Sequence, residues 1–139
     1  MKKAEKSETA KSETTKSETI LVVDDDRAVR QAAADGLRRA GYRVLEASSG
    51  KDALAALDKD KNVDLLLTDI QMQKMDGGEL AETAQERRPE LRVLFMSGYT
   101  GGAALHDSVR DEGPSFIAKP FVMEVLLKKV RAVLALKSE

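Results

Sequence analysis

Carboxylate, hydroxyl and ammonium side chains stand directly after short apolar runs at several places in this sequence. In chain order these side chains are Asp24, Asp25, Asp69, Ser97 and Lys119. Two like charges about 4 Å apart repel by roughly 4 kcal/mol at an effective dielectric constant near 20, so three clustered acids require a compensating cation. An all-oxygen site that keeps water ligands suits Mg²⁺. A phosphoryl group arriving at Asp69 would satisfy metal, lysine and hydroxyl together, which is the logic of aspartyl-phosphate chemistry.

Each of these acids also has an ordinary structural interpretation. An acid after a strand often only starts a turn or caps the next helix, and for Asp69 alone that interpretation has equal weight. The triplet Asp24–Asp26 taken alone is more typical of a solvated turn. The choice therefore depends on whether the fold brings these strand ends together.

The elements that must position these side chains alternate along the chain. Apolar, β-favouring runs predict five strands, at residues 20–23, 42–47, 63–68, 92–96 and 116–118. Apolar residues at helical spacing predict five helices, at about residues 27–40, 50–58, 77–88, 102–112 and 122–136. Asp26 and the pair Ser48-Ser49 are expected caps, and Gly41 should end the first helix.

The last helix should present one apolar stripe to the core. The residues expected in this stripe are Val122, Val125, Leu126, Val130 and Val133.

Alternating strands and helices imply an α/β fold with a doubly wound parallel sheet covered on both faces. Right-handed crossovers leave few topologies, and the flavodoxin-like strand order 2-1-3-4-5 is the natural one for five such units. In that order the first and third strands are neighbours. Asp24, Asp25 and Asp69 then lie side by side at the carboxyl edge, where ligands collect in open α/β sheets.

The first 19 residues differ in character from the rest. The tetrapeptide Lys-Ser-Glu-Thr occurs there three times, and no large apolar side chain follows Met1. Such a segment cannot bury enough surface to offset its ordering entropy. We therefore expect residues 1–19 to be a disordered tail or linker and residues 20–139 to form one domain.

Bulk composition excludes several classes of function. The 139 residues contain no cysteine, which excludes thiol redox chemistry and cysteine-ligated metal sites. The formal net charge of −1 argues against a protein that wraps nucleic acid. No apolar run is long enough to span a bilayer, and no signal-peptide core follows Met1. We expect a soluble, cytoplasmic domain without direct nucleic-acid binding or membrane insertion.

Four segments resemble the receiver domains of two-component response regulators. They are ILVVDDD (20–26), LLLTDIQMQKMDGGEL (65–80), VLFMSGYT (93–100) and FIAKPF (116–121). Each is modest alone, but four in this order on these strand ends are specific, and the resemblance covers about residues 20–136. It implies a phosphorelay switch rather than an enzyme, with at most self-phosphorylation from small phosphodonors and slow self-dephosphorylation.

The resemblance assigns an acceptor and a metal site. Asp69 would take a phosphoryl group from the phosphohistidine of a histidine kinase or a histidine phosphotransfer protein. Asp69 and Asp25 would bind Mg²⁺ directly, Asp24 would hold the metal through water, and the backbone carbonyl of Gln71 would be a further ligand.

The resemblance also assigns the residues that respond to the phosphoryl group. Lys119 would pair with its oxygens, and the hydroxyl of Ser97 would donate a hydrogen bond to them. Phe116 falls at the position of a switching aromatic, and the Lys119–Pro120 bond at the position of a cis peptide. The surface of helix four, strand five and helix five would then change for an unknown downstream protein.

One residue departs from the family pattern DIxMPxMDG, because Gln73 stands where the family usually has proline. Proline would stiffen the loop beside the acceptor, so its absence predicts a more mobile loop without removing any reactive atom.

Two alternative functions remain open. Asp24-x-Asp26 superficially resembles the nucleophile motif of haloacid-dehalogenase-type phosphatases, although Ala28 stands where that family has Thr or Val and no cap insertion is present. A receiver-like interaction module without phosphorylation is the other. The chain is either a stand-alone regulator or a receiver from a larger protein, and VLFMSGYT and FIAKPF most resemble receivers of hybrid sensor kinases.

Overall fold

The computed structural model describes residues 18–97 and 116–135. The elements in chain order are β1 (Thr19–Val23), α1 (Arg27–Arg39), β2 (Arg43–Ala47), α2 (Gly50–Lys59), β3 (Val63–Asp69), α3 (Gly77–Arg87), β4 (Arg92–Ser97), β5 (Phe116–Ala118) and α4 (Met123–Leu134). All five expected strands are present. Four of the five expected helices are present as well, and the helix expected at 102–112 lies outside the described residues.

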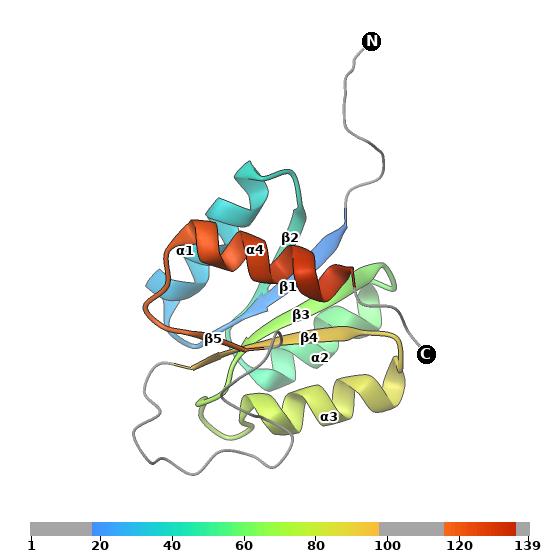
Figure 1. The fold of residues 1–139 in the computed structure, drawn as a ribbon. Coiled ribbons are helices and arrows are strands. Elements are labelled where there is room, and N and C mark those ends of the chain that lie inside the picture. The colour runs from blue at the N-terminus through green and yellow to red at the C-terminus, as the bar shows by residue number, and fades with distance from the viewer. Residues whose placement is uncertain (1–17, 98–115, 136–139) are drawn as a thin grey trace.

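The five strands form one parallel sheet in the order β2-β1-β3-β4-β5, which confirms the predicted flavodoxin-like topology. Figure 1 shows α1 and α4 on one face of the sheet and α2 and α3 on the other. The sheet is therefore doubly wound, and every strand carboxyl end points to the same edge.

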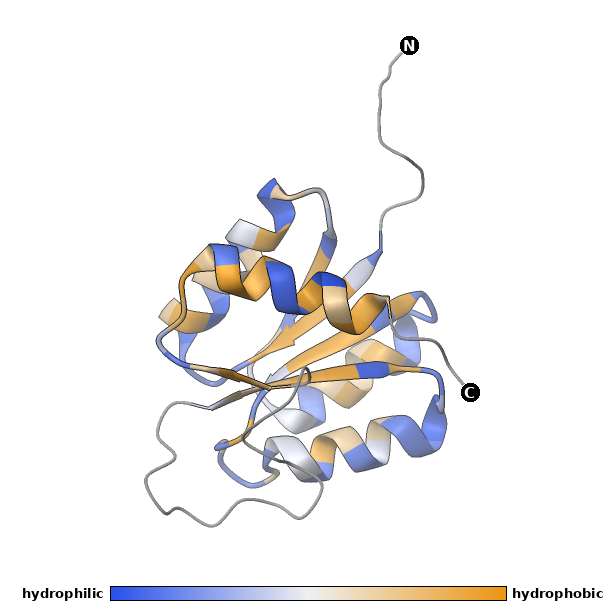
Figure 2. Ribbon diagram, viewed as in Figure 1, coloured by the Kyte–Doolittle hydropathy of each residue, from blue (hydrophilic) through white to orange (hydrophobic). Residues whose placement is uncertain are grey.

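Alternation along each strand divides the core between the two faces. Leu21 and Leu66 pack with α2 and α3, whereas Ile20 and Leu65 pack with α1 and α4. All four side chains are fully buried, as expected for central parallel strands covered on both sides. Figure 2 shows the resulting apolar sheet between helices whose outer faces are hydrophilic.

Short polar side chains set the helix starts that the sequence indicates. The carboxylate of Asp26 accepts hydrogen bonds from the backbone N–H groups of Ala28 and Val29, and the hydroxyl of Ser49 accepts one from Asp52. These contacts satisfy N–H groups that have no partner inside the helix. Gly41 follows α1 with φ of 104°, a conformation that glycine adopts without strain.

The expected apolar stripe of α4 is wrong at two positions. Leu126, Val130 and Val133 are buried, but Val122 is 62% exposed and Val125 is 41% exposed. Val122 precedes the helix as its N-cap. Val125 lies one residue before Leu126, so the helix turns it about 100° away from the buried stripe. Within the described ranges, no helix combines the length and apolarity needed to cross a membrane.

Candidate functional site

The register of β1 against β3 brings the predicted acids together. Val23 pairs with Thr68, so Asp24 and Asp69 follow at the same level of the sheet. Asp24, Asp25 and Asp69 each offer a carboxylate oxygen, and these three atoms lie within 4.8 Å of one another. The juxtaposition expected from the strand order is therefore present.

Lys119 reaches this cluster from the end of β5. Its Nζ lies 3.0 Å from Oδ2 of Asp24 and 3.2 Å from Oδ1 of Asp69. Its backbone N–H donates to the carbonyl of Ser97 at 2.7 Å, and the Lys119–Pro120 peptide is cis, as expected. One ammonium thus bridges two of the three acids.

The two acids of β1's carboxyl end have different surroundings. Asp24 is fully buried; its Oδ1 accepts from the backbone N–H of Asp26 at 2.8 Å, and its Oδ2 accepts from Lys119. Asp25 is exposed. Asp24 is therefore already hydrogen-bonded through both oxygens, while Asp25 has the more open carboxylate.

The charges of the cluster shift the pKa values of Asp69 and Lys119. Burial and the charge of Asp24 raise the pKa of Asp69 to about 6, against the opposing effect of Lys119. Burial disfavours the charge on Lys119, but the hydrogen bond that Lys119 donates to Asp24 and the charge of Asp69 outweigh this effect and raise the pKa of the ammonium. One lysine therefore does not neutralise the three acids.

Ser97 ends β4 next to the acids. Asp69 pairs with Met96, so Ser97 stands one residue further toward the carboxyl edge. Its side chain is 1% exposed, and its Oγ has no hydrogen-bond partner in the part of the chain that the structure describes. A buried hydroxyl without a partner is costly unless something else satisfies it.

The other two predicted site residues are Gln71 and Phe116. Gln71 is exposed, two residues beyond Asp69. Phe116 is 7% exposed, pairs in register with Phe95 and packs in the cluster that faces α2 and α3. Phe116 is therefore a core side chain in this conformation.

Gly77 is a residue that sequence reasoning treated only as the start of a helix. Its backbone N–H donates to the carbonyl of Ile70 at 2.8 Å, and a Cβ built on it would overlap the carbonyl oxygen of Asp69. The first turn of α3 therefore packs directly on the backbone of the central acid, which only glycine permits. The signal in the sequence is a Gly eight residues after the acid.

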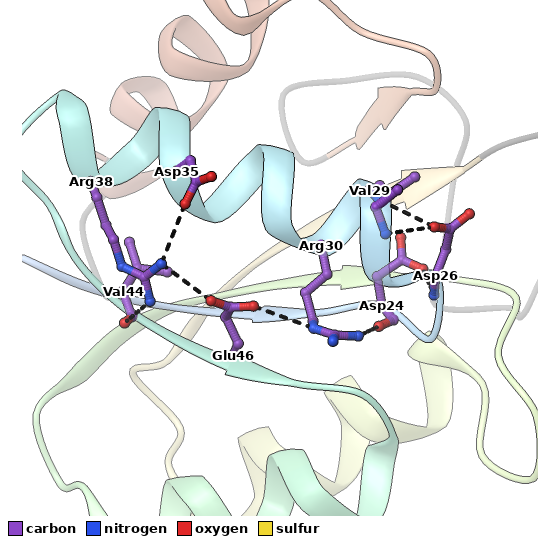
Figure 3. A network of polar contacts seen from close by, with 9 residues as sticks. Asp24, Asp26, Val29, Arg30, Asp35, Arg38, Val44 and Glu46 are labelled. Atoms are coloured by element: carbon purple, nitrogen blue, oxygen red, sulfur yellow. Dashed lines mark hydrogen bonds and ion pairs between the residues drawn. The ribbon is translucent and has the colours of Figure 1, made fainter.

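Arg30 is the second residue that sequence reasoning missed. It stands one turn into α1, and its guanidinium contacts the carbonyl oxygen of Asp24 and the carboxylate of Glu46 on β2 (Figure 3). Its only sequence signal is a basic residue four positions after the helix cap Asp26.

The donor set suits a small, hard cation. Three carboxylates converge, one of them exposed, and the nearby hydroxyl of Ser97 is buried without a partner among the described residues. Oxygen ligands of this kind are those that Mg²⁺ prefers, and an open carboxylate leaves room for water ligands. The residues present therefore fit the metal that the sequence predicts.

Comparisons with known proteins agree with this geometry. The family model described as the response regulator receiver domain matches residues 20–131. The response regulator receiver protein CpdR from Brucella abortus is 35% identical over 115 residues, which are 83% of this chain and 95% of CpdR. The sensor kinase CckA from the same organism is 33% identical over 117 residues, which are 84% of this chain but 12% of the kinase.

Solved structures give the same result. The chemotaxis protein CheY4 of Vibrio cholerae has a TM-score of 0.73 at 28% identity, covering 85% of this chain and 99% of CheY4. The receiver domain of the hybrid histidine kinase CckA has a TM-score of 0.68 at 35% identity, covering 84% and 98%. A family match over most of the sequence and the shared fold lead to one conclusion: the chain belongs to the response regulator receiver domains of two-component signalling.

Proposed function

We propose that Asp69 accepts a phosphoryl group from a phosphohistidine, with Mg²⁺, and that the chain acts as a signalling switch. The observation that carries this proposal is the position of Asp69. Its buried carboxylate shares one site with two further acids, and its Oδ1 lies 3.2 Å from the ammonium of Lys119. The donor is a histidine kinase or a histidine phosphotransfer protein, which the similarity to a sensor kinase and a hybrid histidine kinase supports.

The reaction is a displacement at phosphorus. An oxygen of ionised Asp69 attacks the phosphorus, the P–N bond to the imidazole breaks, and the imidazole nitrogen keeps the electron pair and is reprotonated. Asp69 must be ionised to attack. A pKa of about 6 leaves it ionised at pH 7 while keeping its basicity higher than that of an ordinary aspartate.

Mg²⁺, when bound, neutralises charge on the phosphoryl oxygens during the transfer of the phosphoryl group. Asp25 and Asp69 would hold it directly, and the carbonyl of Gln71 would complete the set. Asp24 would act through water, since both of its oxygens are already hydrogen-bonded.

Lys119 and Ser97 would hold the transferred group. The ammonium bridges Asp24 and Asp69, so new phosphoryl oxygens on Asp69 arrive within its reach. The Ser97 hydroxyl would donate to them, which gives its buried Oγ the partner that it lacks in the described part of the chain.

The output follows from a local change in charge. Phosphorylation adds about −1.5 to −2 charges at Asp69. Ser97 would move toward that charge, and Phe116, now buried, would turn into the space left behind. Coupling of this kind needs about 1–3 kcal/mol. The surface around β5 and α4 would then change, and a downstream protein would bind the changed surface.

The test is to incubate the chain with Mg²⁺ and a small phosphodonor such as acetyl phosphate, and then to map the label by mass spectrometry. We expect one label on Asp69, lost in Asp69→Ala and absent without Mg²⁺. Asp58→Ala is the matched control, because Asp58 is an exposed acid of α2 that pairs with Arg87, and its labelling should equal that of the unmodified chain.

Other outcomes identify the alternatives. A label on Asp24 would indicate the phosphatase-like chemistry, although the carboxylate of Asp26 is engaged as the cap of α1. No label from small donors or from phosphorylated histidine phosphotransfer proteins would indicate an interaction module without phosphorylation.

A further inference from the structure

Arg30 links the acid site to the edge of the sheet. Its Nη1 donates to the carbonyl oxygen of Asp24 at 2.8 Å, and its Nε lies 3.4 Å from Oε1 of Glu46. Its side chain is only 16% exposed. Figure 3 shows the guanidinium between the end of β1 and the side chain of Glu46 on β2.

The carbonyl that Arg30 binds belongs to the peptide unit that joins Asp24 to Asp25. A hydrogen bond to this oxygen fixes the orientation of the peptide plane, and the plane sets the direction in which the Asp25 side chain leaves the backbone. The other polar atoms of Asp24 are held separately: its N–H lies 3.3 Å from the carbonyl of Ala47, and its carboxylate is bound by Asp26 and Lys119. Arg30 therefore restrains the part of the turn that carries the exposed acid.

Glu46 is itself fixed by a second arginine. Its Oε2 lies 3.2 Å from Nη1 of Arg38, which also donates through Nη2 to the carbonyl of Val44 at 3.1 Å. Glu46 thus lies between the two guanidinium groups. This arrangement keeps the charge of Arg30 partly compensated, so that Arg30 can bind a carbonyl rather than the carboxylates of the site.

We propose that Arg30 is a positioning residue for the divalent cation: it orients the Asp24–Asp25 peptide so that Asp25 meets the metal, and Glu46 holds Arg30 in place. This inference rests on the proposed function, because it needs a metal at the three acids. A purely electrostatic role predicts the opposite effect on metal binding, because a cation beside the site repels Mg²⁺. The two roles therefore differ in sign.

The experiment measures Mg²⁺ affinity alone, without phosphorylation. ¹⁵N-labelled protein is titrated with Mg²⁺ and the dissociation constant is fitted from the amide signals of the turn, including Asp25. Arg30→Met removes both hydrogen bonds and keeps the aliphatic stem. We expect Mg²⁺ to bind about 10-fold more weakly, in the range measured when partners of metal ligands are removed. In the metal-free protein, the ¹⁵N shift of Asp25 should also change, because its peptide unit loses a hydrogen bond.

Arg38→Met is the matched control. It removes the same charge and also contacts Glu46, but no described contact joins Arg38 to Asp24. We expect its affinity for Mg²⁺ to stay within twofold of the unmodified chain. Arg30→Lys, which keeps a donor but not the fork, should recover part of the loss. If Arg30→Met does not fold, Glu46→Gln provides the same test with a weakening smaller than the one expected for Arg30→Met, since it loosens Arg30 without removing it.

The outcomes separate the two proposals. Equal or tighter binding in Arg30→Met, or equal weakening in Arg30→Met and Arg38→Met, would overturn the positioning role while leaving the metal site intact. Failure of the unmodified chain to bind Mg²⁺ at these acids would overturn the proposed function and this inference with it.

Discussion

The acids at the two edges of the sheet differ in how their charges are compensated. At the amino edge Asp60 and Asp64 each have a partner of their own: Arg43 donates to Asp60 at 2.7 Å, and Asp64 accepts from the backbone N–H of Thr19 at 2.9 Å. At the carboxyl edge three acids gather, and one lysine contacts two of them, Asp24 and Asp69. The hydrogen bond from Arg43 lowers the pKa of Asp60, whereas burial and a neighbouring acid raise the pKa of Asp69 to about 6.

The charged groups at the carboxyl edge therefore stabilise the fold less than those at the amino edge, and they suit the proposed chemistry instead. The amino edge is satisfied by the chain itself and holds the start of β1, β2 and β3 in place. The carboxyl edge is left short of positive charge, which a bound metal ion would supply. A carboxyl group whose pKa is raised by burial and by a neighbouring acid, as at Asp69, is typical of functional sites. The substitutions below test this difference, in order of decreasing expected effect.

The largest expected effect is loss of the shared cation in Lys119→Met. Without Mg²⁺ at pH 7 the acids are then left unpaired, and we expect the free energy of unfolding to fall by about 3 kcal/mol. Saturating Mg²⁺ should restore part of this loss. Urea unfolding with and without the metal measures both values. Lys61→Met, an exposed lysine at the amino edge, is the control and should change stability by less than about 0.5 kcal/mol. Equal losses of stability in Lys119→Met and Lys61→Met would contradict the difference between the two edges.

Arg88→Met should destabilise the amino edge by about 2 kcal/mol. Its guanidinium donates to the backbone carbonyls of Asp60 and Val63, at 3.1 Å each, and these acceptors lose their partner. Its neighbour Arg87 pairs with the exposed carboxylate of Asp58, so Arg87→Met should cost less than about 0.5 kcal/mol. Guanidinium unfolding of both variants gives the comparison, and similar values would show that the carbonyl contacts contribute little.

Asp69→Asn should stabilise the metal-free protein at pH 7 by about 2 kcal/mol. The pKa of Asp69 is raised from 3.8 to about 6, so the folded chain holds this proton more tightly than the unfolded chain. The ionised carboxylate therefore costs nothing below about pH 4, and its cost grows until about pH 6–7. The gain from Asn should follow the same course in denaturation measured across pH.

Asp60→Asn is the opposite case. The lowered pKa of Asp60 contributes stability that is present at neutral pH and is lost as the pH falls below its ordinary value. This variant should therefore be less stable at pH 7 and approach the unmodified chain in acid. Stabilisation by both aspartate substitutions would contradict the difference between the edges.

The smallest expected effect concerns the backbone next to the acceptor. Lys74 has a φ of 72°, the left-handed region that a side chain disfavours. Lys74→Gly should raise stability by about 0.5–1 kcal/mol, visible as a higher melting temperature. Gln73→Gly is the control one residue earlier, without positive φ, and should lower the melting temperature instead.

The sheet and its acids are predictable from the sequence for a simple reason. Parallel strands place all carboxyl ends at one edge, so Asp24, Asp25 and Asp69 must meet once the strand order is known. The helix caps Asp26 and Ser49 are local and equally readable. Lys119 at the same edge follows from the position of β5, although its bridge between two acids does not.

What sequence reasoning missed depends on three-dimensional packing. Arg30 binds a carbonyl across a turn, and nothing in helical spacing distinguishes it from the solvated Arg27. The overlap that a Cβ at Gly77 would cause depends on the exact approach of α3 to β3. The exposure of Val122 and Val125 was also missed. A valine beside the buried stripe and a valine within it are the same residue type, so residue type alone does not separate them.

The hydrogen bond from Gly77 to Ile70 has a consequence for how this family can vary. It joins the two ends of the β3–α3 connection, so the six residues between them form a closed ring on a fixed base. The tip of that ring can accept Gln73 in place of proline, or a left-handed Lys74, without displacing Asp69. We therefore expect that the six residues of this ring can be replaced by the corresponding residues of other receivers while Asp69 keeps its position.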